Sequence, residues 1–324
     1  MSFISLLFAF LLEQVRPLAS GHGLERSFQA WAEWLKNNLD AGDTRHAWTA
    51  WLLAVGVPCL LVVAIHWWLM LSVGWVFAML WSLAVLYATL GFRRFSHHFT
   101  GIRDALATGD DVLARELLRD WQGDSDLLIS RTEIVRHVIE HSALAAHRHV
   151  FGVVAWFSVL AALGLGPVGA LFFRLSALLN NDWGEKPQSI DPAETQVSAS
   201  LKSVSLMAWR RVDWLPARLT GLTFAVVGNF EDAVDAWRQG AENFQNPNDG
   251  VVLASTAGAI NVRLGGAVSE PDYADPTIDQ ETNPPTAGRE PEFAHLRSMV
   301  GLVWRAVVMW MVLLALLTLA RLVG

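Results

Sequence analysis

Cysteine is almost absent from this sequence: Cys59 is the only one in 324 residues. A single cysteine excludes a disulfide framework and a CxxC metal site. Basic residues are also scarce, because 24 Lys and Arg stand against 31 Asp and Glu, and the resulting net charge of −7 argues against nucleic-acid binding. Charged residues of both signs make up only 17% of the chain, whereas 53% is hydrophobic and 16 residues are Trp. This composition favours a membrane protein.

Three long stretches carry no charge or a single charge. Residues 47–92 contain no Asp, Glu, Lys or Arg. One straight helix of that length would measure roughly 69 Å, more than twice a hydrocarbon core of about 30 Å, so two spans with a tight turn near residues 72–74 are predicted. Residues 150–173 are also uncharged but are interrupted by Gly and Pro between 164 and 169. Residues 299–319 contain only Arg305 and predict a C-terminal span.

The expected fold class is all-α: a multi-pass integral membrane protein with helical soluble segments between the spans. Its first partner is then the lipid bilayer, and the sequence is compatible with an oligomer in the membrane. The predicted segments are an N-terminal apolar segment and amphipathic interfacial helix (1–46), a transmembrane helical hairpin (47–92), a soluble helical segment (93–149), a transmembrane or re-entrant helix (150–174), a helical region bearing the motifs (175–268), an acidic Pro-rich linker (269–298) and a C-terminal transmembrane helix (299–324).

The soluble segment contains two helical patterns. The first is broken at residues 109–110, and the second covers residues 127–144. The second pattern is rich in charge, with Arg136 and Glu140 among its residues, and such a run predicts a solvated face. His137, Glu140 and His141 follow an HxxEH spacing, but five residues are a weak match and no third ligand stands out. We therefore predict no metal site.

Three blocks between residues 213 and 266 combine Pro and Gly with groups that bind anions. In the first, Pro216 is expected to start a helix, which would place Arg218 in the first turn where backbone N–H groups favour an anion. The second block, residues 247–250, has a turn signature. The third ends in Gly265-Gly266, with Arg263 beside it. Alternatively, Arg218 and Arg263 pair with Asp213 or with a helix C-terminus and only hold the fold.

These blocks resemble the membrane-bound CobD/CbiB family, whose pattern is Ile-Pro-Ala-Arg-Leu-Thr, then Pro-Asn-Ala-Gly leading into Gly-Ala-Leu-Gly-Val-Arg-Leu-Gly-Gly. Residues 105–110 correspond to a further element of the family, Ala-Leu-x-x-Gly-Asp. The positions of this sequence that match the main blocks are Pro216, Ala217, Arg218, Leu219, Thr220, Pro247, Asn248, Gly250, Gly258, Ala259, Val262, Arg263, Leu264, Gly265 and Gly266.

The resemblance implies a multi-pass protein of the cell inner membrane that joins the propionate carboxylate of (adenosyl)cobyric acid to aminopropanol, or to its phosphate, by an amide bond. A corrinoid would then be the small-molecule substrate. Activation of the carboxylate suggests ATP with Mg²⁺, which rests on the resemblance alone because the sequence contains no P-loop. No cofactor is evident from the residues themselves.

Several positions depart from the family pattern. The His-Pro element near Glu13 is missing, Ala145, Ala146 and His147 replace the Glu-Asn-Thr element, and Leu253 replaces a family glutamate. Such losses are typical of a diverged relative. The related AmpE branch, which is linked to β-lactamase regulation, is similar in the Glu13-bearing N-terminus and in the Asp213-Trp214-x-Pro spacing.

Two hypotheses follow. The first is an amide-forming synthase with Glu140 as its catalytic acid and with Arg218, Asn248, Arg263 and Asp213 as substrate-binding residues. The second is a non-enzymatic, AmpE-like regulatory or sensor protein of the inner membrane. A helical adaptor is disfavoured because no 34-residue period appears, and a transporter because the spans lack charged residues. Whether the chain is an enzyme is left open between the two hypotheses.

Overall fold

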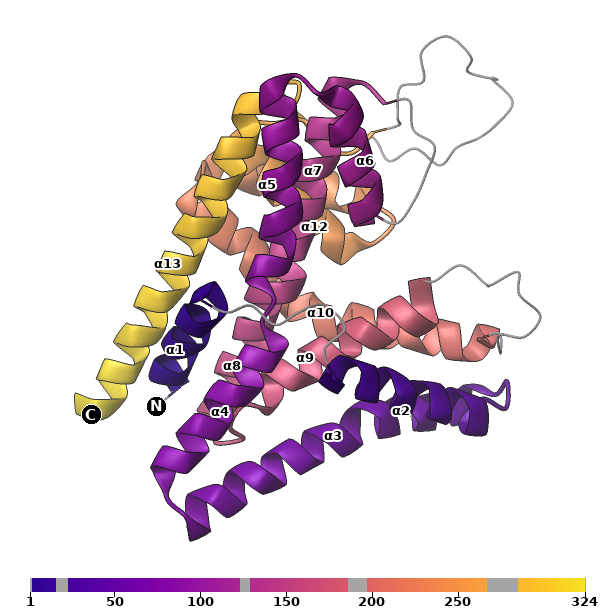
Figure 1. Cartoon of the computed structure of the whole chain (residues 1–324), viewed down its shortest axis with the longest axis vertical. Coiled ribbons are helices and arrows are strands. Elements are labelled where there is room, and N and C mark those ends of the chain that lie inside the picture. Colours follow the sequence, from indigo (N-terminus) through magenta and orange to yellow (C-terminus); the bar gives the residue numbers. More distant parts are fainter. Residues whose placement is uncertain (1, 16–22, 123–128, 186–196, 267–284, 324) are drawn as a thin grey trace. The chain divides into compact units, whose positions relative to one another are not determined.

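The computed structural model describes residues 2–15, 23–122, 129–185, 197–266 and 285–323. These residues form an all-α protein in which the only β-pairing of the described part is an isolated bridge between Val262 and Arg289. The helices (Figure 1) are α1 (Ser2–Val15), α2 (Gly23–Leu39), α3 (Thr44–Ser72), α4 (Trp75–Thr89), α5 (Phe92–Thr108), α6 (Asp111–Gln122), α7 (Arg131–Ala146), η1 (His147–Phe151), α8 (Gly152–Ala162), α9 (Val168–Leu179), η2 (Asn180–Glu185), α10 (Ala199–Val227), α11 (Phe230–Gly240), η3 (Ala241–Asn243), α12 (Pro247–Ile260) and α13 (Phe293–Val323).

The chain divides into two compact units. The first contains residues 1–91 and 148–216, and the second contains residues 92–147 and 217–324. Helices α1 to α4, α8 and α9 therefore belong to the first unit, and α5 to α7 and α11 to α13 belong to the second. The boundary between Pro216 and Ala217 falls inside α10.

The hairpin predicted within residues 47–92 is present in the first unit. Helix α3 ends at Ser72, and α4 begins at Trp75 after a turn at Val73 and Gly74. Gly74 adopts a φ of 116°, which residues other than glycine rarely adopt. This glycine explains why the turn lies here. Trp81 of α4 also donates to the carbonyl of Val62 on α3 over 3.3 Å, which ties the two helices together.

The break predicted over the Gly-Pro segment is also present. Residues 150–173 form α8 and α9, which pack against each other in the first unit (Figure 1). A Cβ atom at Gly169 would lie 2.0 Å from the backbone oxygen of Trp156, so only glycine permits this approach. Helix α8 continues α7 and η1, whereas α9 has 12 residues and is shorter than the roughly 20 residues of a membrane span.

The first helical pattern of the segment predicted at 93–149 forms two helices of the second unit, α5 and α6. They are separated at Gly109 and Asp110, where Gly109 has a φ of 78° and Asp110 Oδ1 accepts from Leu113 N over 3.0 Å. Helices α11 and α12 also pack closely in this unit: a Cβ at Gly258 would lie 2.2 Å from Asp232 O. Gly258, just before the third block, thus serves helix packing.

The expectation of a solvated charged face on the helix predicted at 127–144 is wrong for Arg136. This helix is α7, on which Arg136 is only 6% exposed. The charge is compatible with burial because Arg136 forms an ion pair with Glu133. Ser130 caps the helix by accepting from Glu133 N over 3.3 Å.

Three helices are long and apolar enough to cross a membrane by length and composition: Thr44–Ser72, Arg131–Ala162 and Phe293–Ala320. The middle one joins α7, η1 and α8, so it begins 19 residues before the apolar run at Val150 that the sequence predicts. Phe3–Val15 and Trp75–Thr89 are shorter apolar helices. The apolar residues of α13 with exposed side chains are Phe293, Val300, Trp304, Val308, Val312, Leu313, Leu316, Leu317 and Leu319.

The linker predicted at 269–298 is shorter in the structure, because α13 already begins at Phe293. Most of it, residues 267–284, lies outside the described residues. Its described end pairs with the third block: Thr286 N donates to Leu264 O over 2.8 Å, and Arg263 N donates to Arg289 O over 2.7 Å. Arg93 and Arg94 follow the predicted second span, and their side chains are not among those that the structure describes.

Candidate functional site

Pro216 does not start a helix, so this prediction is wrong. It lies inside α10, which continues from Ala199 to Val227. A proline in a helix removes the hydrogen bond to the carbonyl four residues earlier, which here is Val212. Trp156 Nε1 donates to that carbonyl over 3.0 Å. The indole of another helix thus satisfies the acceptor that Pro216 leaves without its helical donor.

The turn expected at residues 247–250 is instead the first turn of α12, so this prediction is also wrong. Asn246 is the N-cap, and its Oδ1 accepts from Asn248 N over 3.1 Å. Its Nδ2 donates to Asp249 Oδ2 over 3.1 Å, and Pro247 takes the first helical position, where its missing N–H costs nothing. The proline-started helix therefore begins at Pro247.

Arg218 and Asn248 lie together in the second unit. Arg218 Nη1 donates to Asn248 Oδ1 over 3.1 Å, although the two residues are 30 positions apart. Asn248 is 4% exposed and belongs to the first turn of α12. Arg218 is thus at a helix N-terminus as expected, but the helix is α12 and not its own. Unpaired N–H groups and the helix dipole favour an anion at such a terminus.

Two residues just after Arg218 also pack in the second unit. Thr220 Oγ1 and His147 Nδ1 are 2.9 Å apart, and both side chains are fully buried. A Cβ on Gly221 would lie 2.8 Å from Ser255 Oγ of α12, so the two helices approach closely there. The residues that follow Arg218 hold α10 against its neighbours and keep the arginine in place.

The third block is an extended segment after α12. Gly265 and Gly266 adopt φ values of 73° and 98°, as the sequence predicts. The segment alternates, because Val262 and Leu264 are fully buried whereas Arg263 is exposed. Arg263 therefore presents its guanidinium on the solvent side of the segment, where an anionic ligand can reach it.

Glu140 contacts this third block. Its Oε1 accepts a hydrogen bond from Gly265 N over 2.7 Å. Arg136, one turn earlier on α7, donates from Nη1 to Gly265 O over 2.7 Å. The sequence pattern predicts no role for Arg136 at the site, because its charged run indicates a solvated face. Arg136 and Glu140 instead bind the Gly265 backbone.

The fifth predicted site residue, Asp213, is fully buried in the part of α10 that belongs to the first unit. Arg218, Asn248, Arg263 and Glu140 all belong to the second unit. Within that unit the structure brings Arg218 to Asn248, and Glu140 to the block that carries Arg263.

The described residues contain no group of three or more His, Cys, Asp or Glu side chains that could hold a metal ion. Within the HxxEH spacing, His137 Nδ1 lies 3.7 Å from Glu140 Oε2. The His141 ring instead contacts Trp121 edge-on, with 4.4 Å between ring centroids. The two histidines of this spacing therefore contact different groups.

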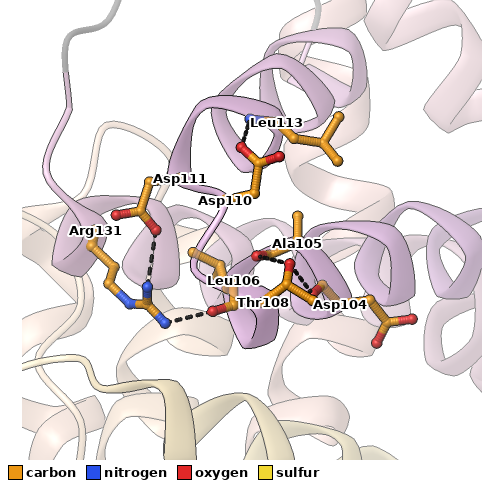
Figure 2. A network of polar contacts seen from close by, with 8 residues as sticks. All are labelled: Asp104, Ala105, Leu106, Thr108, Asp110, Asp111, Leu113 and Arg131. Atoms are coloured by element: carbon orange, nitrogen blue, oxygen red, sulfur yellow. Dashed lines mark hydrogen bonds and ion pairs between the residues drawn. The ribbon is translucent and has the colours of Figure 1, made fainter.

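The element at residues 105–110 forms the junction of α5 and α6 (Figure 2). Arg131, at the start of α7, joins both helices: Nη2 donates to Leu106 O over 2.6 Å, and Nη1 lies 3.0 Å from Asp111 Oδ1. Thr108 Oγ1 also bonds back to Ala105 O over 2.9 Å, which closes the end of α5. These contacts make the element a structural support for α7, the helix that carries Glu140.

The fold and the motif blocks define an all-α protein whose apolar helices fit a membrane and whose Arg218–Asn248 and Glu140–Gly265 contacts both lie in the second unit. The chain belongs to the CobD/CbiB family: the family model described as "CobD/Cbib protein" matches residues 6–303.

Three bacterial relatives are each named "Cobalamin biosynthesis protein CobD". That of Stutzerimonas stutzeri is 28% identical over 84% of this chain and 82% of its own length. That of Chromobacterium violaceum is 33% identical over 56% of this chain and 54% of its own length. That of Leptospira interrogans is 26% identical over 59% of this chain and 58% of its own length. No solved structure shows a significant match to this chain.

Proposed function

We propose that this chain is a multi-pass protein of the cell inner membrane that acts in cobalamin biosynthesis. Its reaction would join the carboxylate of a corrinoid, adenosylcobyric acid, to the amine of aminopropanol or of its phosphate. The new bond is an amide between the carboxyl carbon and the amine nitrogen. One C–O bond of the activated carboxyl group would break, its oxygen would leave with a phosphoryl group from ATP, and the amine nitrogen would lose a proton. Support comes from the family match over residues 6–303 and from relatives named as cobalamin biosynthesis proteins.

One structural observation carries the proposal: Arg218 and Asn248, from two separate family blocks, form a hydrogen bond of 3.1 Å. An arginine and an amide at a helix N-terminus suit a carboxylate or phosphate, because the guanidinium and the backbone N–H groups all donate hydrogen bonds. Arg263, exposed on the third block, would bind the phosphate when the amine substrate is aminopropanol phosphate.

Activation of the carboxylate requires a leaving group, for which we propose ATP with Mg²⁺ as the co-substrate. The described residues do not fit a resident metal site, since they contain no group of three or more suitable ligands. The residues of this chain would therefore serve to bind and orient the two substrates.

Complementation of a strain that lacks cobinamide synthase tests the proposal. The wild-type chain should restore growth on cobyric acid, and Arg218→Ala and Arg263→Ala should each abolish it. Lys202→Ala serves as the matched control, because Lys202 is an exposed cation on the same helix as Arg218. Absence of growth with wild-type protein present in the membrane fraction would overturn the proposal and favour the AmpE-like regulatory role.

Membrane insertion is tested separately. The proposed spans include α3 and α13, whose apolar helices are 29 and 31 residues long. The protein should remain in the membrane pellet after alkaline carbonate extraction. Release into the supernatant would argue against integral insertion whatever the result of the growth test.

A further inference from the structure

Two charged side chains of α7 are directed at the backbone of one residue of the third block, Gly265. Arg136 and Glu140 are four residues apart and so share a face of the helix. Glu140 accepts from Gly265 N, and Arg136 donates to Gly265 O, each over 2.7 Å. Both hydrogen-bonding groups of Gly265 thus have a charged partner, and such bonds are stronger than neutral ones.

We propose that Arg136 and Glu140 are positioning residues that clamp Gly265 and thereby fix the exposed Arg263 side chain for binding the anionic group of a substrate. The inference rests on the proposed function for the identity of that substrate. It assigns Glu140 a role through the backbone, in contrast to the catalytic acid that the sequence suggests.

The other end of the segment is also anchored. Arg263 N donates to Arg289 O over 2.7 Å, and Leu264 N donates to Thr286 Oγ1 over 2.9 Å. Val262 and Leu264 are fully buried on either side of Arg263. The backbone of Arg263 is therefore held between these bonds and the clamp, which leaves mainly its side-chain torsions free.

The clamp also explains the second glycine. A Cβ on Gly266 would lie 3.3 Å from Arg136 Nη1, and the φ of Gly266 is 98°. A larger residue would push against the guanidinium, which cannot retreat easily because it also forms an ion pair with Glu133. Arg136 is only 6% exposed, so breaking its contacts would leave a buried charge without compensation.

The amide variant Glu140→Gln separates a positioning role from an acid role. Glutamine keeps an oxygen that accepts from Gly265 N but cannot act as a carboxylic acid. Glu140→Ala removes both functions. A positioning residue is therefore rescued by glutamine, whereas a catalytic acid is not.

The first measurement is hydrogen exchange of the full-length protein in detergent micelles, followed at the amides of residues 262–266. Glu140→Ala should accelerate exchange at Gly265 by about tenfold or more, the effect of losing one charged hydrogen bond, and Glu140→Gln should stay near wild type. Glu116→Ala is the control, because Glu116 is exposed on α6. Unchanged exchange in Glu140→Ala would overturn the clamp.

The second measurement is the amide-forming reaction itself. Glu140→Ala should raise KM for the anionic substrate by about tenfold with a smaller effect on kcat, and Glu140→Gln should restore KM. If Glu140→Gln is as inactive as Glu140→Ala, the positioning role is refuted. If wild-type protein lacks the activity, the proposed function fails, and the exchange measurement still decides the clamp.

Discussion

Arg218 Nη1 and Asn248 Oδ1 form a hydrogen bond of 3.1 Å that joins the middle of α10 to the first turn of α12. The two residues come from separate blocks of the family pattern, and the fold brings them together inside one unit. Asn248 is almost fully buried, so this bond supports stability as well as the proposed binding of an anion.

A double-mutant cycle tests this bond. Arg218→Met and Asn248→Ala should each destabilise the protein by roughly 1.5–3 kcal/mol, because a hydrogen bond to a charged group is lost. The double variant should be less destabilised than the sum, with a coupling energy of about 1–2 kcal/mol. Unfolding in detergent micelles measures these values. Additive effects would show that the two side chains do not interact in solution.

Trp156 and Pro216 provide the second test. Trp156→Phe should destabilise the protein by about 1–3 kcal/mol, because Val212 O loses its donor in a buried position. Adding Pro216→Ala should recover part of that loss, since alanine at 216 supplies the helical N–H for the same carbonyl. Thermal unfolding of both variants checks this. A double variant no more stable than Trp156→Phe alone would contradict the explanation for the helix passing through Pro216.

Gly258 provides the third test. Gly258→Ala should lower the unfolding midpoint strongly and reduce the yield of folded protein, because its Cβ would lie 2.2 Å from Asp232 O. Overpacking of this kind costs about 1–3 kcal/mol or more. Gly301→Ala is the matched control, since a Cβ there meets nothing within 4 Å. Equal unfolding midpoints of the two variants would show that α11 and α12 are not packed as described.

Arg131 provides the fourth test (Figure 2). Arg131→Ala removes the donor to Leu106 O and the ion pair with Asp111, so we expect a destabilisation of about 1–3 kcal/mol. Arg103→Ala should change the stability by less than about 0.5 kcal/mol, because its contact with Asp104 is exposed. Chemical denaturation compares the two. A similar small effect for both would mean that the junction of α5, α6 and α7 does not depend on Arg131.

The sequence predicts the helix breaks well because their causes are local. Gly74 and Gly109 adopt backbone conformations that favour glycine, and the Gly-Pro segment before α9 cannot continue a helix. The long apolar runs likewise indicate α3 and α13, because the length of an apolar run can be read without knowing its neighbours. The amphipathic helix expected at residues 24–39 is α2.

The errors at the site come from long-range partners. Pro216 lies inside a helix because Trp156, distant in sequence, supplies the donor, and no local pattern shows this. Asn246-Pro247 does contain a local signal of a helix start, because an N-cap residue is followed by proline at the first helical position. Residues 247–250 also fit a turn pattern, which led to the wrong prediction. The partners of Arg136 and Glu140 lie more than a hundred residues along the chain, beyond any spacing rule.

Leu264 and Thr286 form hydrogen bonds with each other, and residues 267–284 lie between them in the sequence. The two ends of this segment are therefore held close together. A connecting segment whose flanking residues are already held together tolerates insertions at small entropic cost. An epitope or fluorescent tag placed within residues 267–284 should therefore leave the Arg263 segment intact. Its accessibility in sealed vesicles would then report on which face of the membrane the substrate must arrive.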